Sequence, residues 1–529
     1  MALIGIDVGS GSARAGVFDE GGTLLGTASH PIALYRDGLR VEQSSDHIWA
    51  AVCTSVKGAM AEAGLTAGKI AGIGFDATCS LVVLGPDGTP LPVGDAPERN
   101  IMVWMDHRAL EQAERINAMG HRVLDYVGGR ISPEMETPKL LWLKENAPQV
   151  YADAWQFMDL TDFLTWRATG DLARSICTVT CKWTYLGHDG GWDDSYFRQI
   201  GLGDLADDGF RRIGAHVVDA GAALGSGLTA EAAAELGLSP GTPVGAGLID
   251  AHAGGVGTVG ATEGGGAEAN LAYVFGTSSC TMTSTSEPVF VPGVWGPYYS
   301  AMVPRLWLNE GGQSAAGAAV DQLIDFHPAA PAALDAARAA QLSLPAWLAR
   351  RAEAMAPDGD VTELLRGLHV VPEVLGNRAP HADPHTRAVI AGLGMERDED
   401  HLVRLYLACI SSIGYGLRQI VEAQTEAGAG AERIVLSGGA GRSPLIRRLL
   451  ADAVGLPLAI PETAEPVLLG SAILGAVAGG VHGDIPAGMA AMSRLLAIIE
   501  PDPKARDQHL ERYRVFEALQ TTARASRAV

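Results

Sequence analysis

Leu3-Ile-Gly-Ile-Asp7-Val-Gly-Ser-Gly-Ser12 is the stretch that decides the fold of this 529-residue chain. Its apolar first half is typical of a buried strand, which ends at Asp7. The glycines and serines that follow predict a tight turn, and Ala13–Phe18 predicts the returning strand of a hairpin. A similar pattern recurs at 272–284, where an apolar strand runs into the turn Gly276-Thr-Ser-Ser279 and another strand returns. Two halves that open alike predict an internal duplication.

Both turns place small and hydroxyl-bearing residues where a phosphate group can approach the backbone. The predicted phosphate-binding residues are Gly9, Ser10, Ser12 and Arg14 in the first turn, and Gly276, Thr277 and Ser278 in the second. Asp7, at the end of its strand, offers a carboxylate for Mg²⁺, directly or through water. Taken alone, each turn fits an ordinary glycine hairpin better than it fits a phosphate-binding site. Together they predict that the phosphate chain of a nucleotide is held between the two halves.

Three further apolar strands end at polar or small residues. Ile70–Phe75 is followed by Asp76, Val244–Ile249 by Asp250, and Arg433–Leu436 by Ser437-Gly-Gly-Ala-Gly441. A carboxylate at the end of a buried strand can accept a proton from a substrate hydroxyl. The alternative for Asp250 is a structural role as the cap of a helix N-terminus.

Helical periodicity and capping residues predict helices after Ser44, from Ser443 to Val454 and from Pro466 to Gly480. We interpret the Ala- and Pro-rich segment Pro328–Leu365 as helices of a peripheral insertion. The end of the chain, after Pro503, is interpreted as a charged, exposed helix. The glycine-dense stretch near 255–270 predicts the domain boundary, which gives domains at 1–260 and 261–529.

The charge balance excludes several classes of function. The chain has 61 acidic and 39 basic residues and a formal net charge of −22. Nucleic acids and anionic membrane surfaces bind proteins through clustered Lys and Arg. Because this chain is strongly acidic, we expect neither as a partner. We also find no run of about 18 apolar residues and no basic flank typical of a signal peptide. The expectation is therefore a cytoplasmic protein.

Cysteine and histidine patterns predict no structural metal. The six cysteines are too sparse for a disulfide scaffold, so reduced thiols are expected. Cys177 and Cys181 are four residues apart, but no second Cys or His pair lies nearby at zinc spacing. The sequence His381-Ala-Asp-Pro-His385 looks like a metal cluster, but it lies in a Pro-rich loop with no further ligand set nearby.

Taken together, these motifs resemble those of the FGGY family of carbohydrate kinases. The matching stretches follow one another in the family's order: Gly5–Arg14, Val41–Gln43, Trp104–Arg108, Gly245–Gly254, Phe275–Ser278, Glu310–Ser314 and Leu436–Ala440. The resemblance implies an α/β fold with two actin/hexokinase/Hsp70-like (ribonuclease H-like) domains and a cleft between them. Within the family the chain is most similar to the ribulokinases, and Gly74–Val82 is similar to the D-ribulokinase branch in particular.

The resemblance also implies roles for individual residues. It implies that Asp250 is the general base and, with Asp7, a ligand of Mg²⁺, while His252 orients or packs. Gly438 and Gly439 are implied to hold the adenosine of ATP, with Ser443 capping the next helix. Sugar recognition needs convergent donors and acceptors, and the candidates are Asp76, Thr78, Trp104, Asp106, Lys182, Asp250 and Glu310. For Lys182 and Glu310 the resemblance itself implies contact with the sugar. Trp104 fits core packing equally well.

The function expected from this resemblance is transfer of the γ-phosphoryl group of ATP to a terminal hydroxyl of D-ribulose. L-Ribulose, ribitol, D-xylulose and other pentitols remain open as substrates. Two alternatives come from other classes: an actin- or Hsp70-like ATPase switch, for which the two phosphate turns alone would suffice, and a sugar sensor without catalysis. Members of the family are commonly dimers, so a homodimer is a possible assembly.

Overall fold

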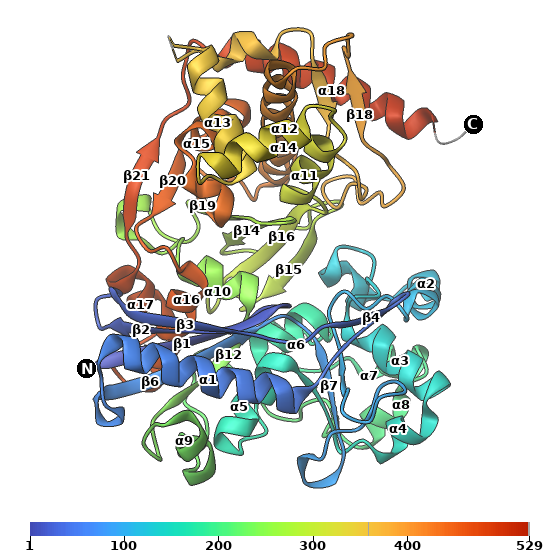
Figure 1. Ribbon diagram of the computed structural model, residues 1–529. Helices are drawn as coiled ribbons and strands as arrows, with labels where there is room; N and C mark the ends of the chain where they lie inside the picture. Colours follow the sequence, from blue (N-terminus) through green and yellow to red (C-terminus); the bar gives the residue numbers. More distant parts are fainter. Residues whose placement is uncertain (358, 527–529) are drawn as a thin grey trace.

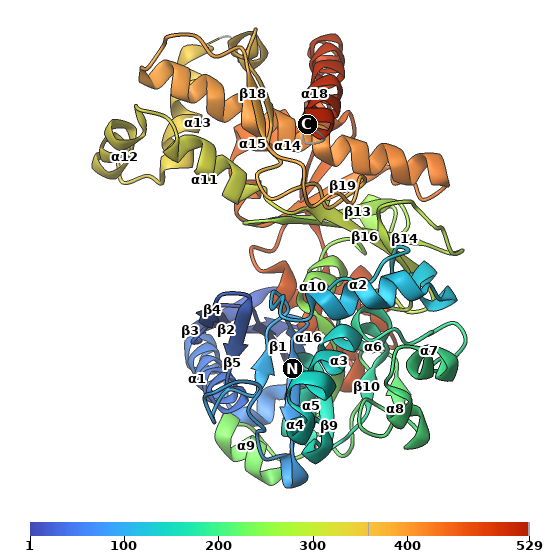
Figure 2. The same cartoon turned by 90° about the vertical axis from the view of Figure 1, so that its right-hand side faces the viewer.

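The computed structural model describes residues 1–357 and 359–526 and has two lobes (Figures 1 and 2). The N-terminal lobe is built on a five-stranded sheet, and the C-terminal lobe on a seven-stranded sheet. The first sheet has the order β12 (Val244–Ile249), β6 (Ile70–Ala77), β1 (Ala2–Val8), β2 (Ser12–Asp19), β3 (Leu24–Pro31). The second has the order β15 (Trp295–Tyr299), β16 (Trp307–Gln313), β14 (Ser279–Thr285), β13 (Asn270–Phe275), β19 (Arg433–Ser437), β20 (Leu458–Pro461), β21 (Leu495–Ile499).

The two sheets share the arrangement that the duplicated sequence pattern predicts. In the first, β1 forms an antiparallel hairpin with β2 and pairs in parallel with β6. In the second, β13 forms an antiparallel hairpin with β14 and pairs in parallel with β19. The two small-residue turns therefore occupy equivalent places, each at the carboxyl end of the first strand of a sheet.

The strand register brings three aspartates to one edge of the first sheet. Asp7 on β1 is the register partner of Asp76 on β6. The neighbouring strand β12 runs parallel to β6 and ends at Ile249, and Asp250 then begins helix α10 (Asp250–Val256). The N-cap of α10 is Ile249, so Asp250 does not occupy the cap position. Ligands of open parallel sheets bind at the carboxyl ends of the strands, which is where these carboxylates lie.

One helix from the C-terminal half packs on the sheet of the N-terminal lobe. Helix α16 (Pro466–Ala478) contacts β1, β6, β12 and α10. In both views it lies beside the N-terminal strands (Figures 1 and 2). Gly5 on β1 and Gly74 on β6 permit this approach, because a Cβ there would lie 1.9 Å from backbone oxygens of α16. One hydrophobic core consequently contains residues of both halves, such as Leu3, Met282 and Leu468.

Helices cover the other faces of the two sheets. The predicted helix after Ser44 is α1 (Ser45–Ala63), with Ser44 as its N-cap, and the helix expected from Ser443 is α15 (Pro444–Val454), with Ser443 as its N-cap. The chain also forms α5 (Leu160–Thr169), α6 (Ile176–Lys182), α11 (Gly317–Asp325), α12 (Ala330–Ala339), α13 (Leu344–Met355), α14 (Glu399–Ala427) and α18 (Arg506–Ser526).

Two expectations about the C-terminal half need correction. The segment Pro328–Leu365 is helical as expected, but its helix α13 lines a large cavity and is not peripheral. The C-terminal helix α18 is not simply exposed, because Tyr513 and Phe516 pack with Tyr415 of α14 in a small core. In α18 the apolar residues that make these contacts are few, so the polar majority of its sequence dominated the pattern.

Neither a membrane span nor a disulfide is present in the described part of the chain. No helix there is long and apolar enough to cross a bilayer. All six cysteines are free, and five of them are buried, in agreement with the expected reduced thiols.

Candidate active site

Two cavities adjoin the ends of the duplicated strands. The first has a volume of about 440 Å³, and its lining includes Asp7, Lys182, Asp250 and Glu310. The second has a volume of about 720 Å³ and lies within the C-terminal lobe, between α13, α14 and α15. The turn after β13 borders both, because Ser278 lines the smaller cavity while Gly276 and Thr277 line the larger one. The two cavities therefore share this turn as part of their walls.

The smaller cavity contains the first turn as well. Gly9, Ser10, Ser12 and Arg14 all line it. The N–H of Gly9 donates to the Ser12 carbonyl at 3.0 Å, which closes the turn. Arg14 donates through Nε to Asp7 at 2.7 Å and through Nη1 to Glu465 at 2.7 Å. Arg14 thus joins the carboxylate edge of the first sheet to the residue that precedes α16.

Asp250 has the protonation behaviour of a proton acceptor near neutral pH. Burial raises the pKa of its carboxyl group to about 6, and the negative charge of Asp7 acts in the same direction. The hydrogen bond from the Ala251 N–H, at 2.8 Å, opposes this shift. A general base works best with a pKa close to the working pH. Asp250 therefore combines a position in the cavity wall with a suitable proton affinity.

Asp76 lies behind the cavity and does not belong to its described lining. Its Oδ2 accepts a hydrogen bond from Ser471 of α16 at 2.5 Å, and its Oδ1 has no partner in the described structure. Burial and the nearby charge of Asp7 raise the pKa of Asp76 well above its ordinary value. Asp76 is thus placed to act on Asp7 and on α16, not on a molecule in the cavity.

Lys182 and Glu310 form a buried pair of opposite charges on the cavity wall. Burial alone would raise the pKa of Glu310, but Lys182 and a hydrogen bond from His252 lower it to about 2. Burial likewise disfavours the charged form of Lys182, whereas the neighbouring Cys79 and Glu310 raise its pKa well above the ordinary value. Both groups are therefore charged at neutral pH, and each can hydrogen-bond a hydroxyl group of a ligand.

Aromatic rings complete the wall of this cavity. Trp104 lines it, and its indole Nε1 donates to the Ser10 hydroxyl at 3.0 Å, so the ring also fixes the first turn. Trp295 on β15 is the register partner of Glu310 on β16 and lies under the Lys182 ammonium group, 5.2 Å from its ring centroid. Thr78 also lines the cavity. Apolar ring faces beside paired charges suit a polyhydroxylated ligand.

Asp106 lies away from the described lining of both cavities. Its carboxylate accepts hydrogen bonds from Arg108 and from the Val41 N–H, at 2.7 Å for the latter, and it is fully buried. These contacts tie the loop after β8 (Ile101–Met102) to β5 (Arg40–Gln43). The structure gives Asp106 a structural position and does not bring it to the sugar-binding candidates.

The larger cavity contains four of the ten predicted nucleotide-binding residues, and five others line the smaller cavity. Gly276, Thr277, Gly439 and Ser443 line it, whereas Gly438 is not part of the described lining. Gly438 has a φ of 92°, and a Cβ there would lie 2.3 Å from the Phe275 carbonyl oxygen. It therefore shapes the turn after β19 that places Gly439 in the wall.

Family models match the chain along most of its length. The N-terminal domain of the FGGY family of carbohydrate kinases matches residues 2–257, and the C-terminal domain of the same family matches residues 271–479. The chain belongs to the FGGY family of carbohydrate kinases. The resemblance seen in the motifs is thereby confirmed.

Relatives and solved structures of FGGY kinases agree with this assignment. A human FGGY carbohydrate kinase domain-containing protein is 45% identical, over 98% of this chain and 95% of its own length. A D-ribulokinase of Saccharomyces cerevisiae is 39% identical, over 90% of this chain and 71% of its own length. The crystal structure of a xylulose kinase from Rhodospirillum rubrum aligns with a TM-score of 0.81 at 22% identity, covering 99% of each chain. This last likeness shows the predicted fold.

Three charged or aromatic residues on the wall of the smaller cavity of this FGGY kinase escaped the sequence analysis. They are Glu134, Trp295 and Arg378. Glu134 lies within 3.2 Å of His107, whose contact keeps the pKa of Glu134 below its ordinary value against the opposing effect of burial. Arg378 lies 5.4 Å from the ring centroid of Trp295. Glu134 and Arg378 come from irregular segments between helices and strands, where no periodicity marks a residue as facing a cavity.

Proposed function

We propose that this kinase transfers the γ-phosphoryl group of ATP to the terminal hydroxyl of a pentulose, converting D-ribulose to D-ribulose 5-phosphate. The observation that carries the proposal is the shared turn Gly276–Ser278, which borders both a cavity lined by Asp250 and a cavity large enough for a nucleoside. The choice of D-ribulose is supported by the D-ribulokinase from yeast, which is 39% identical to this chain.

Asp250 is proposed to accept the proton of the attacking hydroxyl. The O–H bond of the sugar breaks as its oxygen bonds to the γ-phosphorus, and the bond from that phosphorus to the bridging oxygen of ADP breaks. Phosphoryl transfer depends mainly on positioning and on neutralisation of charge. The N–H groups of both turns and the Arg14 guanidinium group supply donors for the phosphate oxygens.

The acidic edge of the first sheet fits a magnesium ion. Mg²⁺ prefers oxygen ligands, and Asp7 and Asp250 offer carboxylates at the ends of β1 and β12, with a partnerless Asp76 oxygen on β6, the strand between them. When bound, Mg²⁺ would neutralise charge on the transferred phosphate. Asp7 and Asp250 are proposed to hold it, and Arg14 keeps the Asp7 carboxylate oriented by its hydrogen bond through Nε.

The sugar is proposed to lie between the charged pair and the two indole rings. Lys182 donates to hydroxyl or carbonyl oxygens of the sugar, and Glu310 accepts from its hydroxyl groups. A buried polar group left without a partner costs about 1–3 kcal/mol, so these contacts discriminate between stereoisomers. Trp104 and Trp295 offer apolar faces for the C–H groups of the chain.

Replacement of Asp250 tests the proposed base. We expect Asp250→Asn to lower kcat by about 10²- to 10⁴-fold, because the amide cannot take the proton. Binding of Mg·ATP should be retained, as measured by calorimetry. The control is Asp219→Asn, which changes an exposed aspartate in the same half of the chain. Near-normal turnover in Asp250→Asn would contradict the assignment.

A panel of sugars tests the proposed substrate. ADP release is measured with Mg·ATP against D-ribulose, L-ribulose, ribitol and D-xylulose. A preference for D-ribulose in kcat/KM is expected. A preference for another of these compounds would retain the kinase and reject D-ribulose. ADP release that no sugar stimulates would favour the ATPase switch or the sensor.

A further inference from the structure

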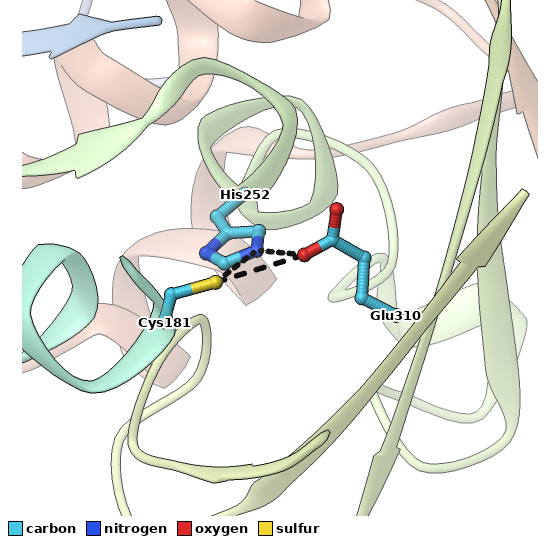
Figure 3. Close-up of side chains that lie close together, drawn as sticks. All are labelled: Cys181, His252 and Glu310. Carbon is cyan, nitrogen blue, oxygen red and sulfur yellow. Dashed lines mark hydrogen bonds and ion pairs between the residues drawn. The ribbon is translucent and has the colours of Figure 1, made fainter. Parts of the chain in front are cut away.

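Cys181, His252 and Glu310 converge on one point beside the smaller cavity (Figure 3). They come from the end of α6, the first turn of α10 and the middle of β16, and all three are buried. The His252 Nε2 lies 3.4 Å from the Glu310 Oε2, and the Cys181 Sγ lies 3.6 Å from the same oxygen. The distance from Cys181 Sγ to His252 Nε2 is 4.0 Å. Within the described residues, this is the group whose donor atoms lie close enough to share a cation.

One tautomer of His252 leaves its Nε2 lone pair free for a ligand, whereas the other is satisfied by Glu310 at Nε2 and by the Cys177 thiol at Nδ1, 3.2 Å away. Its Nδ1 lies 3.1 Å from the carbonyl oxygen of Ala301, which only accepts hydrogen bonds. Its Nε2 faces the Glu310 carboxylate, which also only accepts. A neutral imidazole carries a single N–H, so it can satisfy one of these acceptors and not both. With Nδ1–H donating to Ala301, the lone pair of Nε2 points at the same place as the sulfur and the carboxylate oxygen.

The spacing of the three donor atoms matches the ligand set of a tetrahedral zinc ion. Zinc lies about 2.3 Å from sulfur and about 2.0–2.2 Å from nitrogen and oxygen, so tetrahedral ligands lie about 3.3–3.6 Å apart. Two of the three observed distances agree with this range, and the third needs a movement of about 0.4 Å. Ligating histidines usually donate their second N–H to a carboxylate or a backbone carbonyl. The Ala301 carbonyl is such a partner.

We propose that Cys181, His252 and Glu310 bind a thiophilic divalent cation of the zinc class, in an inhibitory site separate from the magnesium position. The fourth ligand is a water molecule from the cavity that Glu310 lines. On binding, the S–H bond of Cys181 breaks, the proton leaves to solvent, and the sulfur bonds to the cation. The thiolate and the Glu310 carboxylate then offset the charge of the ion, and Glu310 is shared between the ion and Lys182. The sulfur ligand favours zinc over magnesium, which prefers oxygen.

Occupation of this site would block the kinase. Glu310 is proposed above to bind the sugar, and a carboxylate that ligates zinc cannot accept the same hydroxyl hydrogen bonds. This consequence rests on the proposed function, and it predicts that zinc competes with the sugar and not with ATP. The binding site itself rests only on the geometry of the three side chains.

Direct binding of Zn²⁺ tests the site without any assay of activity. Metal-free protein is titrated with Zn²⁺ in a calorimeter, and one tightly bound ion with release of a proton is expected. Cys181→Ser should weaken this binding by at least about 100-fold, because loss of an outer partner of a zinc ligand alone costs about 10- to 100-fold. Excess Mg²⁺ should leave it unchanged.

Cys177→Ser is the matched control. Cys177 lies on the same helix and also contacts His252, but at Nδ1, 3.2 Å away, on the side opposite to the proposed ion. This variant should bind Zn²⁺ within a few-fold of the unmodified protein. Absence of stoichiometric binding, or equal loss in both variants with folded protein by circular dichroism, would overturn the site. Zn²⁺ binding that does not compete with the sugar would retain the metal site and reject the proposed role of Glu310 in sugar binding.

Discussion

At the scale of residues, local chemistry predicts that carboxylates gather at one edge of the first sheet. Asp7, Asp76 and Asp250 follow short apolar strands, and the parallel register brings those strand ends together. In each case the signal is an aspartate directly after a run of apolar residues. This pattern is visible in the sequence without knowledge of the fold. Glu134 and Arg378 have no such signal, because tertiary packing alone turns them toward the cavity. Cys181 and Glu310 are 129 positions apart, so no spacing rule could pair them.

The titration of Asp250 predicts how the rate depends on pH. A base must be deprotonated, and the pKa of Asp250 is raised to about 6 by burial and by the charge of Asp7. We therefore expect kcat/KM to be constant above pH 7 and to fall about tenfold per unit below pH 6. The measurement is a pH–rate profile with constant ionic strength. A flat profile down to pH 5 would show that the ionisation of Asp250 does not limit the reaction.

At the scale of elements, the sequence predicts helices from their periodicity, but it does not predict the surfaces against which these helices pack. The helix pattern of Pro466–Gly480 is clear in the sequence, and α16 begins at Pro466 as expected. What the pattern does not contain is the surface that α16 covers, which is the sheet of the other lobe. Likewise α13 shows its helical character, but not that one of its faces lines a cavity.

Close packing of α16 on α10 predicts the effect of one added methyl group. A Cβ at Gly470 would lie 1.9 Å from the Ala253 carbonyl oxygen, so α10 and α16 would have to separate. Overpacking of this kind costs about 1–3 kcal/mol, and the shift would displace Asp250 at the start of α10. We expect Gly470→Ala to lower both the Tm and kcat. Gly483→Ala is the control, because a Cβ there meets nothing within 4 Å. Equal behaviour of the two variants would contradict the argument.

The position of α13 predicts a selective loss of nucleotide binding. Ala346 is exposed and lines the larger cavity, so an indole ring at this position would fill space without disturbing the core. Ala346→Trp should raise the KM for ATP at least tenfold and leave the KM for the sugar within twofold. Steady-state kinetics with each substrate varied in turn measures both. Ala332→Trp, at an exposed position of the neighbouring helix α12, should change neither.

At the scale of the whole molecule, the two lobes share one structural core. The sequence divides naturally into two similar halves, and this suggested domains at 1–260 and 261–529. The two halves do not pack as separate units, because α16 of the second half covers the sheet of the first half. An ion pair also links them, where Arg14 in the first half contacts Glu465 just before α16, at 2.7 Å. A nucleotide and a sugar held near this junction would contact both lobes, which suits closure around the substrates.

The shared core predicts that residues 1–260 do not fold alone. Leu468, Leu469, Ile473 and Leu474 of α16 are at most 1% exposed. Burial of such a side chain contributes about 1.5–3 kcal/mol, so the four contribute about 6–12 kcal/mol. The whole stability of a typical domain is about 5–15 kcal/mol, which leaves little for a fragment without this helix. Fragment 1–260 should therefore show no cooperative thermal transition by circular dichroism.

The same fragment joined to residues 463–494 through a flexible linker should regain a cooperative transition. A linker of about 20 residues spans about 25 Å on average. A cooperative transition of 1–260 alone, with native-like protection from hydrogen exchange, would show that the first sheet does not need α16.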